Sequence, residues 1–267
     1  MRCNAKYTPE LVRQGSGIRS GGDQVITIAT SLIPGKNDIQ KLAVNSWLSL
    51  GFQATSINAE EELEALLPVY PEVSFAAAKR HAGHKFGKPY IYFDDVLAYL
   101  AEESGSIGGI VNSDVILVGH HFYEKVYQEA MKAFIYGSRV EIDSLHALQG
   151  NMYDAGFDFF FFDKQLISLY PPEEFCLGVP WWDYWALIIP LIAREKMLIH
   201  YPVKKVINPV AFHIKHPVNW NRNSWHSMGC RLSKYLGIRK ELDVVAMHWY
   251  LQKILSIINT LSQTMTL

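Results

Sequence analysis

The 267-residue sequence is poor in cysteine and in runs of like charge. Its three cysteines, Cys3, Cys176 and Cys230, are far apart and show no CxxC spacing, which argues against a disulfide framework or a zinc knuckle. Lysine and arginine number 25 against 26 aspartate and glutamate, and the basic residues are scattered. The net charge of -1 gives no general reason to expect nucleic acid or an anionic membrane as a partner.

Long apolar runs are also missing. The most apolar segment, WALIIPLIA at 185–193, is too short to span a bilayer and is interrupted by Pro190, so we expect a buried helix there. Residues 1–24 are polar and lack the apolar core of a signal peptide, and we expect a mobile tail. These features favour a cytoplasmic protein with no integral membrane segment.

What the sequence does contain is material for one large core, because 49% of its residues are hydrophobic and 13% aromatic. Its first half alternates β-branched runs with segments of helical apolar spacing. This order predicts an α/β fold, with a mostly parallel sheet flanked by helices in a single domain. Expected strands are 25–30, 52–58 and 74–77; expected helices are 38–51, a segment that breaks at Pro68, and one within 90–104.

Small polar residues follow two of the apolar runs. In parallel sheets, ligands bind outside the carboxyl ends of the strands. We therefore expect the loop after 25–30 and the segment Asn112, Ser113 and Asp114 to open onto one crevice. Asp114 has two interpretations. It is either a turn residue or helix cap, or a ligand of a divalent cation that neutralises the phosphates of a nucleotide.

Two later segments carry further candidates for chemistry. His213 and His216 are possible metal ligands; on a helix they would share one face, whereas on an extended chain they would point to opposite sides. Asp183 lies among aromatic residues, which can raise its proton affinity and suit it to general-base catalysis. The alternative is that Asp183 caps the following helix and that Trp181 and Trp182 belong to the core.

Five segments taken in order resemble bacterial nucleotide-diphospho-sugar transferases of the GT-A fold. The resemblance covers roughly 25–220, with NSD in the place of the family's DXD-type motif, so that Asn112 replaces the first Asp. The segments are VITIATSLIPGKNDIQKLAVNSWLSLGFQATSINAEEEL, GGIVNSDVIL, GFDFFFFDK, FCLGVPWWDYW and HIKHPVNW.

The resemblance implies a GT-A-like domain at 25–239, with a donor half at about 25–120 and an acceptor half at about 121–239. It implies a glycosyltransferase of the hexosyltransferase type that transfers the sugar of a UDP- or GDP-sugar to a glycan or other hydroxyl acceptor, with inversion. The donor nucleotide would lie near Thr30, Ser31, Asn58, Glu60, Asn112, Ser113 and Asp114.

The resemblance also implies roles for residues of the second half. Asp114 with His213 or His216 would hold Mn²⁺ or Mg²⁺ against the diphosphate. Asp183 would deprotonate the acceptor hydroxyl. Asp158, Trp181 and Trp182 would border the acceptor, although Asp158 also fits a turn at a strand edge.

Two other functions stay open: a non-catalytic sugar-nucleotide or carbohydrate-binding protein, and a sugar nucleotidyltransferase. The latter usually has a Gly-rich loop with basic residues after its first strand, and this chain has only Gly35 and Lys36 there. Residues 240–267 are expected to form an amphipathic helix. Packing against the domain is one interpretation, and peripheral contact with the inner membrane surface is the other, if the acceptor is a lipid-linked glycan.

Overall fold

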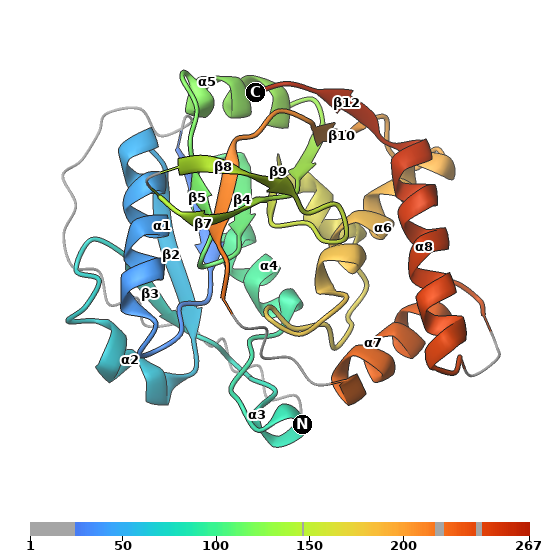
Figure 1. The fold of residues 1–267 in the computed structure, drawn as a ribbon, viewed down its shortest axis with the longest axis horizontal. Coiled ribbons are helices and arrows are strands. Elements are labelled where there is room, and N and C mark those ends of the chain that lie inside the picture. Colours follow the sequence, from blue (N-terminus) through green and yellow to red (C-terminus); the bar gives the residue numbers. More distant parts are fainter. Residues whose placement is uncertain (1–24, 146, 217–221, 239–241) are drawn as a thin grey trace, which may run out of the picture.

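The computed structural model describes residues 25–145, 147–216, 222–238 and 242–267 (Figure 1), and the predicted tail at 1–24 lies outside them. An eight-stranded mixed sheet forms the centre of the fold. One strand of this sheet, the fourth from one edge, runs antiparallel to both of its neighbours, and the other pairs are parallel. The strand order is β12 (Gln263–Met265), β10 (Val203–Val206), β6 (Phe134–Gly137), β9 (Phe159–Asp163), β4 (Ile107–Val111), β1 (Ile26–Thr30), β2 (Gln53–Asn58) and β3 (Ser74–Ala77).

A smaller sheet and the helices surround the central one. The four strands of the smaller sheet are, in order, β5 (Ile116–Leu117), β11 (Ala211–Ile214), β7 (Val140–Ser144) and β8 (Ala147–Met152). The helices are α1 (Asn37–Leu50), α2 (Glu60–Leu66), α3 (Gly83–Phe86), α4 (Phe93–Glu102), α5 (Phe122–Ala130), α6 (Trp182–Glu195), α7 (Arg222–Tyr235) and α8 (Val244–Leu261), with a 3₁₀ helix at Lys164–Leu169.

The central sheet is buried on both faces, as β9 illustrates. Its four phenylalanines alternate between two hydrophobic clusters, because successive side chains of a strand point to opposite faces. Phe159 and Phe161 pack with α1, α5 and the smaller sheet. Phe160 and Phe162 pack with α4, α6 and α8 on the other face. A run of four buried phenylalanines is therefore the pattern of a central strand covered on both sides.

The α/β fold predicted from the alternating pattern is confirmed, and the helix expected around 185–193 is the middle of the buried helix α6. The helix expected over 240–267 is shorter than predicted. Helix α8 ends at Leu261, and the chain then pairs as β12 with β10 at the sheet edge. β12 consists of only three residues, Gln-Thr-Met, which are too few to show the alternation that would reveal a strand. Within the described residues, no helix combines the length and apolarity that a membrane crossing requires.

The strand order places a topological switch point between β1 and β4. From β1 the chain adds β2 and β3 on one side, and it then returns to place β4 on the other side of β1. Loops that leave β1 and β4 at their carboxyl ends consequently diverge. Such a divergence leaves a crevice, which is where open α/β sheets bind ligands.

Candidate active site

A cavity of about 850 Å³ opens at the β1/β4 switch point. Thr30 and Ser31 reach it from the end of β1, and Thr30 Oγ1 donates a hydrogen bond of 2.8 Å to the backbone oxygen of Val111 at the end of β4. The chain after β4 then turns along the cavity wall. The structure thus brings together the five polar residues of these two loops: Thr30, Ser31, Asn112, Ser113 and Asp114.

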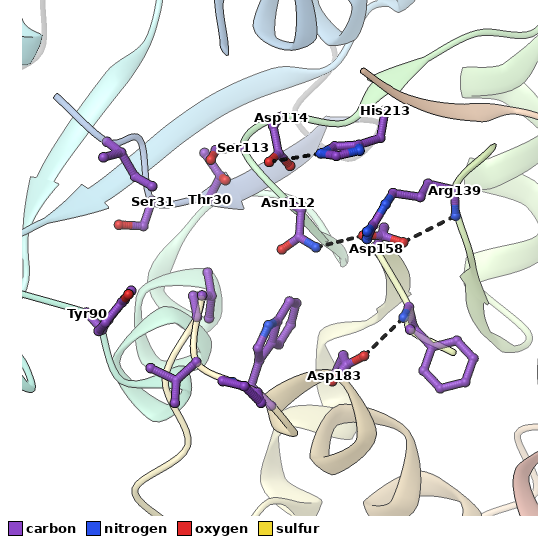
Figure 2. A pocket seen from close by; sticks show the side chains of 18 of the residues that line it. Thr30, Ser31, Tyr90, Asn112, Ser113, Asp114, Arg139, Asp158, Asp183 and His213 are labelled. Carbon is purple, nitrogen blue, oxygen red and sulfur yellow. Dashed lines mark hydrogen bonds and ion pairs between the residues drawn. The ribbon is translucent and has the colours of Figure 1, made fainter. Parts of the chain in front are cut away.

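Asp114 is the centre of a three-residue cluster on this wall. Its Oδ2 lies 3.4 Å from His213 Nε2 and 3.1 Å from His216 Nε2. Each of the three side chains offers one ligand atom, and these atoms lie within 4.8 Å of one another. Figure 2 shows Asp114 and His213 pointing toward each other across the cavity edge.

Strand pairing explains why the two histidines converge. Antiparallel pairing of β11 with β5 sets Phe212 opposite Ile116, which places His213 beside the turn that carries Asp114. Strand β11 ends at Ile214, so the chain leaves the extended conformation before His216. Neither of the two sequence-based geometries for the pair therefore applies, and both imidazoles reach the same carboxylate.

The charge of Asp114 is stabilised by its neighbours. Burial by itself would raise the pKa of the Asp114 carboxyl, but hydrogen bonds and charge interactions with His213 and His216 hold that pKa well below its usual value. Asp114 is thus an anion at neutral pH. The other ring nitrogen of His213, Nδ1, is buried without a hydrogen-bond partner in the described residues.

One carboxylate and two imidazoles form a donor set suited to a divalent transition metal. Carboxylate oxygen and imidazole nitrogen both bind Mn²⁺, whereas Mg²⁺ prefers an all-oxygen shell with several waters. The residues present therefore fit the metal that the GT-A resemblance implies, and they fit Mn²⁺ better than Mg²⁺.

Asn112 does not belong to this cluster, because it faces Asp158 instead. Asn112 Nδ2 donates to Asp158 Oδ1 over 2.9 Å. Arg139 holds the same carboxylate twice: its Nη1 donates to Oδ1 over 2.7 Å and its backbone N–H donates to Oδ2 over 3.2 Å. Arg139 Nη2 also donates to Glu141 over 3.0 Å. Asp158 lines the cavity, but its two oxygens are already occupied by Arg139 and Asn112 (Figure 2).

Asp183 lies on the opposite side of the cavity from Asp114, in the first turn of α6 (Figure 2). Burial raises the pKa of Asp183 to about 7, although the backbone N–H of Phe157 donates to its Oδ2 over 3.0 Å and partly offsets the rise. The nearby charge of Asp158 raises the pKa further. A carboxyl group with this proton affinity on a cavity wall can accept a proton near neutral pH.

Trp181 and Trp182 border the cavity mainly as buried wall residues. Trp181 Nε1 donates to the backbone oxygen of Trp225, and the Trp182 ring packs edge-on against Phe160. Trp181 also has a φ of 79°, a left-handed conformation that is strained for so bulky a residue. Strain of this kind concentrates at functional sites. Here the strained residue is the N-cap of α6, the helix that carries Asp183.

Asn58 and Glu60 are not among the cavity-lining residues. Asn58 is buried beneath the β1 loop, where its Nδ2 donates to the backbone oxygen of Leu32 and to Glu62 Oε2. Glu60 is an exposed residue at the start of α2. Glu62, two residues later in α2, lines the cavity instead.

Several cavity residues carried no signal in the sequence. They come from loops, helices and strand β7 of the second half, where no strand or motif was predicted to bring them to the crevice. Only the aromatic content of those segments hinted at a binding surface. These residues are Arg139, Glu141, Tyr153, Trp225, His248 and Leu251.

Comparison with known proteins rests on architecture alone. No protein-family model matches the chain, and no curated protein sequence matches it. Among solved structures, S. aureus TarS 1–349 in complex with UDP-GlcNAc superposes with a TM-score of 0.53 at 11% identity, covering 89% of this chain and 73% of that one. The chain has a GT-A-like fold.

Two further TarS structures agree with this assignment. The chain matches S. aureus TarS with a TM-score of 0.51 at 10% identity, covering 89% of this chain and 44% of that one. It matches TarS 1–349 in complex with UDP with a TM-score of 0.51 at 9% identity, covering 88% and 70%. At such identities the similarity is one of fold, and it transfers no residue role.

Proposed function

We propose that this protein is a glycosyltransferase that moves a sugar from a nucleotide-diphosphate donor to a hydroxyl acceptor. The observation that carries the proposal is that one cavity of a GT-A-like fold contains two acidic residues in different environments. Asp114 with its two histidines lies at the switch point, and Asp183 lies across the cavity. A donor diphosphate and an acceptor hydroxyl need environments of these two kinds.

The donor nucleotide is proposed to bind at the β1/β4 end of the cavity. Thr30, Ser31 and Ser113 supply hydroxyl groups there, and Lys36 and Lys88, which also line the cavity, supply positive charge for phosphate oxygens. TarS has been crystallised with UDP-GlcNAc and with UDP, which supports a UDP-sugar over a GDP-sugar as the first donor to test.

Asp114, His213 and His216 are the residues that would hold a divalent cation, with Mn²⁺ the better fit. When bound, such an ion would neutralise charge that builds on the diphosphate leaving group. Asp114 supplies the anionic ligand, and its low pKa keeps it deprotonated. A metal site binds through deprotonated ligands, so donor binding should weaken in acid.

Asp183 is proposed as the general base. It would accept the proton of the acceptor hydroxyl as that oxygen attacks the anomeric carbon, while the bond from that carbon to the diphosphate oxygen breaks. Asp183 lies across the cavity from the donor end, so attack and departure occur on opposite faces of the sugar. A single displacement of this kind inverts the anomeric configuration.

A thermal-shift screen tests the donor site. The melting temperature is measured with UDP, GDP, CDP and dTDP, with and without Mn²⁺, on the wild type and on Asp114→Ala. We expect UDP to stabilise the wild type only with Mn²⁺, by an amount set by its concentration relative to Kd. Asp143→Ala is the control, because Asp143 is an exposed carboxylate paired with Lys215. No shift with any nucleotide would remove the donor-site assignment.

A further inference from the structure

The outer surface of α8 and the tip that follows α6 expose large apolar side chains. On α8, Val245 is 80% and Trp249 65% exposed, and at the tip Met197 is 85% and Leu198 68% exposed. Val244 and Ile257 of α8 are about half exposed. We call these six residues the α8 edge. Isolated exposed apolar residues need no explanation, but a set gathered along one element marks an interaction surface.

Val245, Trp249 and Ile257 lie four or eight residues apart on α8, so they share one face of the helix. Arg194 Nη1 donates to the backbone oxygen of Leu261 over 2.9 Å, which joins the end of α6 to the end of α8. Met197 and Leu198 therefore lie beside the C-terminal end of α8, and Val245 lies at its start. Figure 1 shows α8 along the outer margin of the fold, with the end of α6 beside it. The edge extends for the length of an 18-residue helix, about 27 Å.

The α8 edge is not the packing face of the helix. Met247, Tyr250, Ile254 and Ile258 are buried and belong to the core formed with α6. Among the described residues, packing against the domain thus uses the inner face and leaves the outer face exposed. Between α6 and α8, an apolar hollow of about 310 Å³ opens beside Ile257, lined by aliphatic residues with Glu195 and Lys196 at its rim.

The charges near the edge favour an anionic partner. Helix α8 contains no acidic residue, and its one Lys, Lys253, lies with Nζ 5.2 Å from the centre of the Trp249 ring. Lys196 is exposed next to Met197 at the tip. Of the flanking acids, Glu195 is exposed, whereas Asp243 is engaged in capping the helix through the N–H of Ala246.

We propose that the α8 edge docks the protein on an anionic lipid bilayer. Trp249, Met197 and Leu198 would enter the boundary between headgroups and acyl chains, where tryptophan is favoured, and Lys253 and Lys196 would contact lipid phosphates. An apolar stripe with cationic neighbours and no acid on the helix is the pattern of a helix lying in a membrane surface.

Docking would also place the active site near the membrane. His248 and Leu251, on another side of α8, line the main cavity, so the cavity would lie one helix away from the docked surface. This proximity suits an acceptor carried on a lipid. That last step rests on the proposed function, whereas the docking itself does not.

Flotation of the full chain with vesicles tests the proposal. We expect binding to vesicles of phosphatidylglycerol and phosphatidylcholine, and weaker binding to phosphatidylcholine alone. The double variant Met197→Asp, Leu198→Asp and the single variant Trp249→Asp should each lose about tenfold or more in partitioning. Lys253→Ala should lose several-fold on the anionic vesicles only, since each basic residue contributes about 1 kcal/mol there.

Leu42→Asp on α1 is the matched control, because Leu42 is an exposed apolar residue on a helix far from α8 (Figure 1). Melting temperature and the UDP-induced shift, both measured without vesicles, should match the wild type in every variant, which separates docking from folding and from the donor site. Absence of wild-type binding, or an equal loss in the control, would overturn the proposal. So would dimers in light scattering that the same variants dissociate, without vesicle binding.

Discussion

At the scale of single residues, Asp183 gives the most specific pH dependence. The proposed base is the ionised carboxylate of Asp183, whose pKa burial raises to about 7. The value of kcat/KM should therefore fall about tenfold for each pH unit below this pKa and level off above it. Asp183→Asn should lower kcat by about 10²–10⁴-fold and leave UDP binding unchanged. A pH profile that stays flat down to pH 5 would contradict the role of Asp183.

Asp183 also makes the free energy of unfolding depend on pH, and its contribution decreases as the pH rises. The pKa of Asp183 is raised in the folded state from the usual 3.8 to about 7, so the native state binds the extra proton between these values. Its contribution to the free energy of unfolding is full below pH 4 and is lost as the pH rises through about 7. The melting temperature of Asp183→Asn relative to that of the wild type should therefore increase as the pH rises from 5 to 8.

Asp114 allows a test of the metal requirement. Asp114→Asn removes the anionic ligand but keeps the side-chain volume, and we expect Mn²⁺-dependent stabilisation by UDP to disappear, with activity reduced by about 10²-fold or more. Removal of metal from the wild type by EDTA should give a loss of similar size. Asp143→Asn, at an exposed carboxylate, should behave as the wild type. Full UDP binding by the wild type in EDTA would contradict the metal role.

Arg139 and Asp158 form a buried ion pair, with side chains 19% and 1% exposed. Removing the cation leaves a buried carboxylate without its counter-charge, so Arg139→Gln should lower the free energy of unfolding by about 3–5 kcal/mol. The double variant with Asp158→Asn should recover part of this loss. The exposed pair of Lys215 with Asp143 offers the control, since Lys215→Gln should cost less than about 1 kcal/mol. Urea denaturation measures all three; a small effect of Arg139→Gln would contradict the assignment.

At the scale of elements, the adjacent glycines of β4 face opposite sides of the sheet. A Cβ on Gly109 would lie 2.6 Å from Cε1 of the Phe161 ring, which is fully buried. A Cβ on Gly108 would meet a Leu100 methyl at 3.3 Å, and that side chain can adjust. Gly109→Ala should therefore destabilise by about 1–3 kcal/mol, whereas Gly108→Ala should be nearly neutral. Equal urea midpoints for the two variants would contradict this packing.

Elements with a local signal were predictable from the sequence. Helix α1 and strands β2 and β3 lie within one or two residues of their predicted bounds, because apolar spacing and glycine mark their ends. The smaller sheet was not predicted. Strand β11 pairs with β5 and β7, which are about 70 to 100 residues away in sequence, and no local pattern encodes such pairing. β12 was missed for the same reason.

At the scale of the whole molecule, some residues of the candidate site were predictable from the sequence and others were not. Loops at strand ends are predictable once the strands are, so Thr30, Ser31 and Asp114 were placed correctly at one crevice. The pairing of Arg139 with Asp158, and the position of Glu62 in place of Glu60, depend on how distant segments pack. The structure explains why residue 112 is Asn and not a carboxylate, because the Asn112 amide donates a hydrogen bond to Asp158.

The central claim is that one cavity binds a sugar nucleotide and turns it over. The most direct test follows ¹H NMR of UDP-GlcNAc, then of other UDP- and GDP-sugars, incubated with the protein and Mn²⁺, with water as a slow substitute acceptor. We predict release of the nucleoside diphosphate and of a sugar whose first-formed anomer is inverted, with loss of turnover but not of binding in Asp183→Asn. Binding of nucleotide without turnover of any donor would contradict the claim and identify a sugar-nucleotide-binding protein instead.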